Sequence, residues 1–293
     1  QANDTILLIQ MQGVGINTDP GSYGYIQTIY GSPGMHEFLI ILSVNAGNEI
    51  VFKRNILKTY DTKGNIQIVR VPYYNSVTVT STLTCDPWNP STRSGGVLAM
   101  IIGRTLRLDA NIDVSGKGFI GGKDTIGLGL CQTDNYSLYS QEYFARSFTN
   151  AGYKGEGLAI HNFTGTLLES LFAKGLGQNF TGGGGGNGRY SGGGGGGNRG
   201  KGGGGGKEDP SICTIINFPG GNGGFSAEHA SLSSRIFAGG GGGASTSLTG
   251  SSAPGANGGG IVIIIADTIV SHGGNILANG ANAASAIANA GAG

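Results

Sequence analysis

The sequence predicts an all-β protein, in which a small N-terminal β-barrel or sandwich is followed by a β-solenoid-like unit with an inserted polyglycine II bundle. Three observations lead to this prediction. Glycine supplies 60 of the 293 residues, and it disfavours helix interiors by about 1 kcal/mol per position. Short apolar segments alternate with turn residues over the first third of the chain. A glycine-led segment that begins near residue 95 recurs near residue 259.

Residues 1–92 are expected to form the N-terminal unit, because strand-like segments follow one another there. Several of them alternate apolar and polar residues, as IQIVRV does at residues 66–71, and this period of two is typical of half-buried strands. The segments are residues 5–11, 38–44, 49–54, 66–71 and 77–83. Such strands, separated by turn signals, are typical of a small barrel or sandwich.

Residues 93–293 are expected to form the solenoid-like unit, because the chain repeats itself there without a gap. Residues 95–116 match residues 259–280 after a shift of 164 positions (259 minus 95). The identical pairs are Gly95/Gly259, Gly96/Gly260, Ile101/Ile265, Asn111/Asn275, Ile112/Ile276 and Gly116/Gly280. A repeated strand–turn–strand unit is typical of solenoids, whose units bury their apolar faces by stacking. The alternative is that the copies are two similar strands of one sandwich.

Polyglycine runs lie between the two copies, over about residues 182–243. Residues 182–206 contain 18 glycines in 25 positions, and another run occupies residues 239–243. A flexible linker is one interpretation. Aromatic residues beside the runs, such as Phe180 and Phe225, favour packing instead. Neighbouring glycine chains in the polyproline II conformation can satisfy one another's N–H and C=O groups, which predicts an ordered bundle.

The charge pattern indicates neither a nucleic-acid nor a membrane partner. The chain has 18 Lys and Arg residues against 17 Asp and Glu residues, and it shows no basic stripe. Its longest apolar run, residues 261–266, is far shorter than the roughly 20 residues that span a bilayer. We therefore expect no nucleic-acid binding and no membrane insertion. A strand pattern that begins at residue 5 without a signal peptide also leads us to expect a piece of a longer polypeptide.

No catalytic, metal or cofactor site is expected from the motifs. The four histidines are scattered without metal-ligand spacing. The glycine runs lack the hydroxyl residue and the helix of a phosphate-binding loop, and no nucleophile motif is present. Asp109 and Asp113 could ligate calcium, but solvated turn acids are the simpler interpretation. We therefore do not expect an enzyme.

The cysteines are Cys85, Cys131 and Cys213, and they form no CxxC pair, so zinc and redox motifs are not supported. One disulfide with a leftover thiol is one alternative, and buried free thiols are the other, so the pairing stays open. Trp88 is the sole tryptophan and lies between two prolines. We expect it to pack at a domain joint rather than to hold a sugar.

An aromatic cluster marks a candidate ligand-contact site. The residues are Tyr136, Tyr139, Tyr143 and Phe144. Exposed tyrosines on loops commonly form binding faces, because they offer rigid amphipathic area. The alternative is that these side chains pack their segment onto the solenoid-like unit.

Three strings carry a family resemblance. TILLIQMQG, VRVPYYNSVTVTSTLTCDPWNPSTRSGGVLAMII and LDANIDVSGKGFIGG resemble segments of very large Bacteroidota cell-surface adhesins of the gliding-motility type, which the type IX secretion system exports. The resemblance covers roughly residues 4–122 and 259–280. It implies an extracellular, cell-surface location, contact with the secretion machinery during export, and attachment to surface polysaccharide or another extracellular substratum. The family supplies no catalytic residue.

Three Asp-Thr-Ile strings look like the O-glycosylation signal of the same bacteria. Their threonines, Thr5, Thr125 and Thr268, are therefore expected attachment sites.

These observations favour a structural and adhesive segment of a large secreted surface protein. One alternative is a receptor-recognising tip of the phage tail-fibre type, in which loops between packed glycine helices bind the target; the loops between the runs are short here. Another is a solenoid enzyme that degrades polysaccharide, against which the charge-poor repeat units argue.

Overall fold

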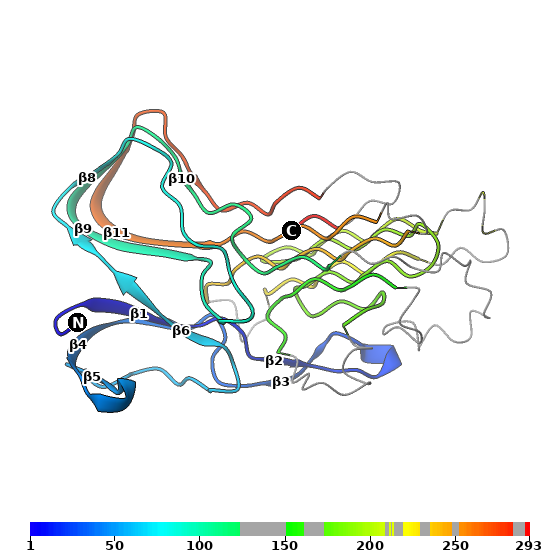
Figure 1. Cartoon of the computed structure of the whole chain (residues 1–293), viewed down its shortest axis with the longest axis horizontal. Helices are drawn as coiled ribbons and strands as arrows, with labels where there is room; N and C mark the ends of the chain where they lie inside the picture. Colours follow the sequence, from blue (N-terminus) through cyan, green and yellow to red (C-terminus); the bar gives the residue numbers. More distant parts are fainter. Residues whose placement is uncertain are drawn as a thin grey trace.

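The computed structural model describes residues 1–123, 151–160, 173–208, 211, 213, 219–228, 235–247, 252–283 and 291–293. Over these residues the regular structure consists of twelve β-strands and two 3-10 turns, η1 (Pro20–Ser22) and η2 (Ala46–Asn48), without an α-helix. The all-β prediction is therefore confirmed. No helix in this part of the chain is long and apolar enough to cross a membrane. Figure 1 shows the two larger sheets at one end of the molecule and long irregular segments at the other.

An open antiparallel sheet forms the N-terminal part. Its strands are, in spatial order, β5 (Ile50–Phe52), β4 (His36–Val44), β1 (Thr5–Gln10) and β6 (Ile66–Val71). The most apolar segment, TILLIQ, takes the centre, where Leu7 lies opposite Phe38 and Val69. Because β5 and β6 end the sheet among the described strands, it does not close on itself. Four of the five predicted strands lie in this sheet, whereas the segment predicted at residues 77–83 lies in a second sheet. The barrel alternative is wrong.

A short hairpin links this sheet to the glycine-rich part. Strand β2 (Val14–Ile16) pairs antiparallel with β3 (Ile26–Ile29). The Val14 N–H donates to the Leu158 carbonyl (3.0 Å), and the Ile160 N–H donates back to the Val14 carbonyl (2.9 Å). Sequence analysis missed this hairpin, because its strands are short and interrupted by glycine.

Three stacked layers of parallel strands form the second sheet. Layer 1 comprises β7 (Tyr73–Tyr74), β8 (Val77–Val79) and Leu83; layer 2 comprises β9 (Val97–Leu108) and β10 (Ile112–Asp113); layer 3 comprises β11 (Ile261–Ser271) and β12 (Ile276–Leu277). Strand β9 pairs in parallel with β7 and β8 on one side and with β11 on the other. Leu83 bridges to Ile112 in the same direction. In Figure 1, β8, β9 and β11 follow one another around the same bend.

The sequence repeat is the pairing register of layers 2 and 3. Ile261 lies opposite Val97, which is the shift of 164 positions found in the sequence (261 minus 97). At the same shift, the Asn275 N–H donates to Oδ1 of Asn111 (2.8 Å). The two copies are therefore neighbours in one parallel sheet.

Two apolar clusters hold these parts together. The first lies inside the layers, and its buried members include Val79, Leu98, Met100, Ile102, Leu106, Leu108, Ile112 and Val114. The second joins the N-terminal sheet, the layers and the glycine-rich part, with Leu7, Ile9, Trp88, Val97, Leu158, Phe180 and Ile261 among its buried members. Apolar contacts therefore cross the boundary predicted at residue 92.

The glycine-rich segments are joined by main-chain hydrogen bonds that recur at every third residue. Four successive N–H groups donate to three different segments: Gly183 to Gly241, Gly184 to Asn222, Gly185 to Gly175 and Gly186 to Ala244. The first and the last of these bonds go to residues three apart, 241 and 244, of the same segment. Figure 1 shows these segments running alongside one another. A flexible linker has no such bonding.

The segments approach so closely that most interior positions have no room for a side chain. A Cβ atom at Gly184 would overlap the Leu176 carbonyl, and one at Gly193 would overlap the Gly243 carbonyl. At Gly203, on an exposed outer segment, it would meet no atom within 4 Å. Close packing therefore explains why interior positions of these runs are glycine.

Candidate functional site

A polar pocket lies where the N-terminal part meets the glycine-rich part. Its volume is about 360 Å³, and it is lined by Gln12, Thr62, Lys63, Asn65, Pro90, Arg93, Glu156, Ala159 and Ile160. These residues come from four separate segments: the end of β1, the loop before β6, the turn before β9, and residues 156–160. The lining is rich in hydrogen-bonding groups, so the pocket suits a polar ligand.

Glu156 is the acid of this pocket, and hydrogen bonds from three directions orient its carboxylate. The Trp88 indole N–H donates to Oε2 (2.9 Å), as does the Ile120 main-chain N–H (3.4 Å). The Gln12 amide donates to Oε1 (3.3 Å). Burial raises the pKa of Glu156 above its ordinary value, although these hydrogen bonds act in the opposite direction.

The amide groups of the pocket are held in place as well. Gln12 Nε2 also donates to the Gly157 carbonyl (2.5 Å), and its Oε1 accepts a hydrogen bond from the Asn65 side chain. The Lys63 ammonium lies 5.1 Å from the centre of the Tyr30 ring. Donors and acceptors are thus positioned before any ligand arrives, which lowers the entropy cost of binding.

The lining of this pocket holds one acidic and two basic side chains. Glycoside hydrolysis ordinarily needs a pair of carboxyl groups about 5–10 Å apart, whereas Glu156 is the one carboxylate among the residues that line the pocket. The cations Lys63 and Arg93 stand in the same lining. Among the described residues, no group of three or more His, Cys, Asp and Glu side chains could hold a metal ion.

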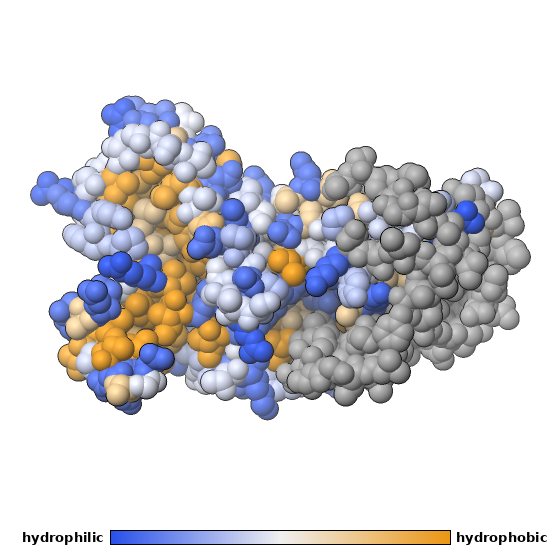
Figure 2. Space-filling model, viewed as in Figure 1, coloured by the Kyte–Doolittle hydropathy of each residue, from blue (hydrophilic) through white to orange (hydrophobic). Residues whose placement is uncertain are grey.

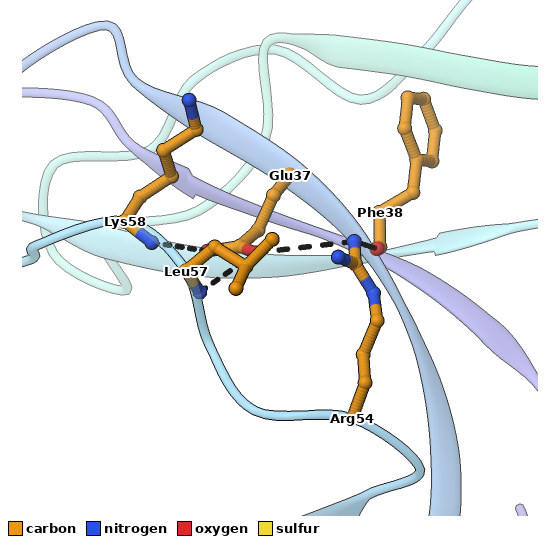
Figure 3. A network of polar contacts seen from close by, with 5 residues as sticks. All are labelled: Glu37, Phe38, Arg54, Leu57 and Lys58. Atoms are coloured by element: carbon orange, nitrogen blue, oxygen red, sulfur yellow. Dashed lines mark hydrogen bonds and ion pairs between the residues drawn. The ribbon is translucent and has the colours of Figure 1, made fainter.

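Glu37 is a second buried carboxylate, and its surroundings give it a structural role. Figure 3 shows its carboxylate facing the loop that follows β5. It accepts main-chain N–H hydrogen bonds from Leu57 (3.2 Å) and Lys58 (3.1 Å). The Arg54 guanidinium nitrogen Nη2 lies 3.9 Å from Oε2 of Glu37 and donates a hydrogen bond to the Phe38 carbonyl (2.6 Å). Glu37 therefore fastens this loop to β4.

Lys154 and Tyr23 form a buried polar pair between the hairpin and the glycine-rich part. The Lys154 ammonium group donates to the Tyr23 hydroxyl, and its nitrogen lies 4.3 Å from the centre of the Tyr23 ring. Burial lowers the pKa of Lys154 well below its ordinary value and raises the pKa of Tyr23. The pair has no open cavity beside it in the described pockets, so we assign it to packing.

Another concavity among the described residues lies between β6 and the start of β9. It measures about 680 Å³ and includes Gln67, Cys85, Asp86, Gly95 and Lys117 in its lining. Gln67 closes one side through two hydrogen bonds with the Gly95 main chain, both 3.0 Å long. Burial raises the pKa of the Cys85 thiol, which lowers its reactivity.

The residues predicted from sequence fall in several places. Tyr136, Tyr139, Tyr143, Phe144 and Thr125 lie outside the described residues. Thr5 is partly buried in β1, whereas Thr268 is exposed on β11. The structure therefore brings neither of these threonines into the pocket, and their glycosylation stays a prediction.

The cysteines and the tryptophan can be placed more fully. Cys85 is a free thiol and Cys213 is disulfide-bonded, which agrees with the alternative of one disulfide and a leftover thiol. Trp88 is 2% exposed and packs edge-on against Phe119 at a centroid distance of 5.6 Å. It joins two parts of the molecule, as expected, and its ring offers no face to a sugar.

Sequence analysis missed Gln12, Asn65 and Glu156. One signal was present, since Glu156 is an isolated acid in the glycine-rich string GYKGEGLAI. Its side-chain partners, Trp88 and Gln12, lie 68 and 144 residues away along the chain, so spacing alone could not bring them together.

Comparisons with protein-family models, curated proteins and solved structures each found no match to this chain. The resemblance to Bacteroidota adhesins stays a prediction.

Proposed function

We propose that this chain is a non-enzymatic, structural and adhesive segment of a large secreted cell-surface protein. In this proposal the type IX secretion system exports it, and it attaches the cell to surface polysaccharide or another extracellular substratum. The observation that carries the proposal is the hydrogen-bonded glycine region. A chain devotes 60 of its 293 residues to glycine at a considerable entropy cost, which a stiff, closely packed scaffold would justify.

The glycine region is proposed to be a polyglycine II bundle. Two features support this. Main-chain bonds return to the same neighbouring segment after three residues, as from Gly183 and Gly186 to residues 241 and 244, and the polyproline II conformation has three residues per turn. Side chains are also excluded at positions such as Gly184. Each segment of such a bundle forms its main-chain hydrogen bonds with neighbouring segments alone, so the segments are rigid only when they are packed together.

The three layers are proposed to be the coils of a short β-solenoid. Their strands are parallel. Layers 2 and 3 pair at a shift of 164 residues from Val97 to Ile102 and again at Ile112, and at a shift of 163 from Thr105 to Leu108. Each layer contributes apolar side chains to a common interior. Solenoids of this kind serve as stiff rods or as extended binding surfaces.

The pocket around Glu156 is the proposed contact with a polyhydroxylated ligand. Sugar hydroxyls both donate and accept, and this lining offers amides from Gln12 and Asn65, one acid and two cations. In this proposal the pocket binds the hydroxyl groups of the ligand through hydrogen bonds and cleaves no covalent bond of the ligand.

A glycan array with the purified chain tests this proposal. We expect binding to one or more surface polysaccharides, and we expect Asn65→Ala and Arg93→Ala each to weaken it about tenfold, as the loss of one or two hydrogen bonds implies. Arg199→Ala is the matched control, because the Arg199 side chain is 87% exposed and lies outside the pocket. Absence of binding to every glycan would contradict adhesion by recognition. Equal effects of Asn65→Ala and Arg199→Ala would contradict the assignment of the pocket.

A further inference from the structure

Layer 3 lies at one end of the parallel sheet, and it exposes apolar side chains at positions where the paired side chains of layer 2 are buried. Ile269 lies opposite Leu106, and Ile276 lies opposite Ile112. Leu106 and Ile112 are 0% exposed, whereas Ile269 is 49% exposed and Ile276 is 42% exposed. Figure 2 shows hydrophobic surface at the end of the molecule that holds the two larger sheets. The layers bury their apolar side chains by stacking. The exposed apolar side chains of layer 3 would therefore be buried if a further layer stacked on it.

Layer 3 also repeats one of the two polar side chains through which layer 2 binds it. Oδ1 of Asn111 accepts the Asn275 N–H (2.8 Å), and Oγ of Ser115 accepts the Asn279 N–H (3.1 Å). At the position of Asn111, layer 3 carries the same residue, Asn275, and it is exposed. Among the described strands, β11 is the edge of its sheet, and an edge strand is a template for another strand. This end of the sheet therefore offers both apolar contacts and a hydrogen-bond acceptor in the register that layers 2 and 3 already use.

Layer 1, at the opposite end of the stack, also exposes an apolar side chain, and its size complements that of the residue at the same position of layer 3. Tyr74 of layer 1 and Ala266 of layer 3 both lie opposite Ile102. Ile102 is 1% exposed, but Tyr74 is 47% exposed. At this register position one end of the stack therefore carries a large side chain and the other end a small one, as interdigitating layers require.

The described C-terminal residues do not cover layer 3. The Gly291 N–H donates to the Gly243 carbonyl (2.9 Å), so residues 291–293 lie in the glycine-rich part. Ile269 and Ile276 keep their exposure in the folded chain. The described residues thus leave the face of layer 3 uncovered, and the exposed face of layer 1 has the strand direction, the register and the side-chain sizes to fit it.

We infer that layer 3 of one copy docks against layer 1 of a second copy, so that copies stack head to tail and extend the parallel sheet. Val270 of one copy then lies beside Thr78 of the next, because both lie opposite Arg107 within one chain. Contacts of this head-to-tail kind do not close into a dimer but continue into a filament. This stacking follows from the register and the exposure of the layers and does not depend on adhesion.

The mass of the purified chain in solution, measured by light scattering over a range of concentrations, is the first test. We expect the mean mass to rise with concentration beyond that of a dimer. Ile269→Lys and Tyr74→Lys, at opposite ends of the stack, should each weaken association at least tenfold. Leu57→Lys is the matched control, since Leu57 is 71% exposed and outside the layers. The mass of a single copy at every concentration would overturn the inference, and so would association that Ile269→Lys leaves unchanged.

A mixing experiment tests the head-to-tail geometry. The Ile269→Lys chain keeps an intact layer 1 face, and the Tyr74→Lys chain keeps an intact layer 3 face. Their mixture should form one-to-one pairs that grow no further, although neither variant associates alone. If the mixed variants stay separate while the wild-type chain associates, the two faces are not partners and the inference is wrong.

Disulfide trapping tests the register without disturbing the interior. Thr78→Cys and Val270→Cys are combined in one chain with Cys85→Ser, which removes the free thiol. Within one chain these positions lie on either side of β9, about two strand spacings of 4.8 Å apart, which exceeds the reach of a disulfide. Oxidation should therefore yield a ladder of covalent oligomers on a non-reducing gel, and neither single cysteine variant should give one. Absence of the ladder at concentrations at which the chain associates would overturn the proposed register.

Discussion

At the scale of single residues, the two buried glutamates differ in what depends on them. Glu37 accepts two main-chain hydrogen bonds from one loop, so its carboxylate replaces the water that those N–H groups would otherwise bind. Glu156 accepts hydrogen bonds from three separate parts of the chain and also lines a pocket. The first carboxylate is part of the fold alone, and the second also faces a space that a ligand can enter.

Replacement of Glu37 by alanine should lower the free energy of unfolding by about 1–3 kcal/mol, because the Leu57 and Lys58 N–H groups lose their acceptor. Glu37→Gln keeps one acceptor oxygen and should cost less. Urea titration of both variants measures the difference, with Glu228→Ala as the control on an exposed side chain. Similar losses for Glu37→Ala and Glu228→Ala would show that the loop does not depend on this carboxylate.

The raised pKa of Glu156 predicts a pH dependence of stability. The native state holds the Glu156 proton more tightly than the unfolded state does. The free energy of unfolding should therefore fall as the pH rises from the ordinary glutamate pKa through the raised one. Glu156→Gln cannot ionise and should lose this part of the fall. Urea titrations at several pH values, with Glu228→Gln as the control, compare the slopes. Equal slopes for Glu156→Gln and the wild-type chain would contradict the prediction.

At the scale of elements, the glycine segments depend on close approach at some positions and not at others. Gly184 is buried against the Leu176 carbonyl, whereas Gly203 faces open space. Gly184→Ala should therefore cost about 1–3 kcal/mol or more through overpacking. Gly203→Ala should instead add about 0.4–1 kcal/mol, because it restricts the unfolded chain. Thermal unfolding measures both, and a neutral Gly184→Ala would contradict the packing described for this region.

Sequence analysis could predict those elements whose signal is local or repeated. The register of layers 2 and 3 was visible because glycine, asparagine and isoleucine recur at identical spacing, from Gly95 to Gly280. Layer 1 was predicted only as a strand at residues 77–83 and not as a copy of layer 2, because its residues differ from those they pair with: Tyr73 lies opposite Ile101, and Val77 lies opposite Leu106.

The remaining gaps arise from contacts between distant residues. Whether the N-terminal sheet closes depends on how β5 and β6 are placed, which no strand pattern records. The pocket likewise joins Gln12 to Glu156, 144 residues apart. Composition indicated packed glycine, but which glycines are indispensable follows from neighbours that only the fold brings close.

At the scale of the whole molecule, one apolar cluster joins the N-terminal sheet, the layers and the glycine-rich part. We therefore expect these parts to unfold together. Trp88 is the sole tryptophan and lies in this cluster, so its fluorescence reports on the junction. Denaturation followed by Trp88 fluorescence and by circular dichroism should give coincident transitions. Two separate transitions would show that the N-terminal sheet and the layers unfold independently.

The bonding of glycine segments at every third residue limits how their lengths can change in evolution. In the proposed polyglycine II conformation, deletion of one glycine would turn the rest of its run by a third of a turn, so that each N–H group would face a different neighbour. Insertion of three glycines would restore every direction and lengthen the run by about 9 Å. The interior glycine runs of this protein's relatives should therefore differ in length by multiples of three residues, because only such changes keep each N–H group directed at the same neighbouring segment.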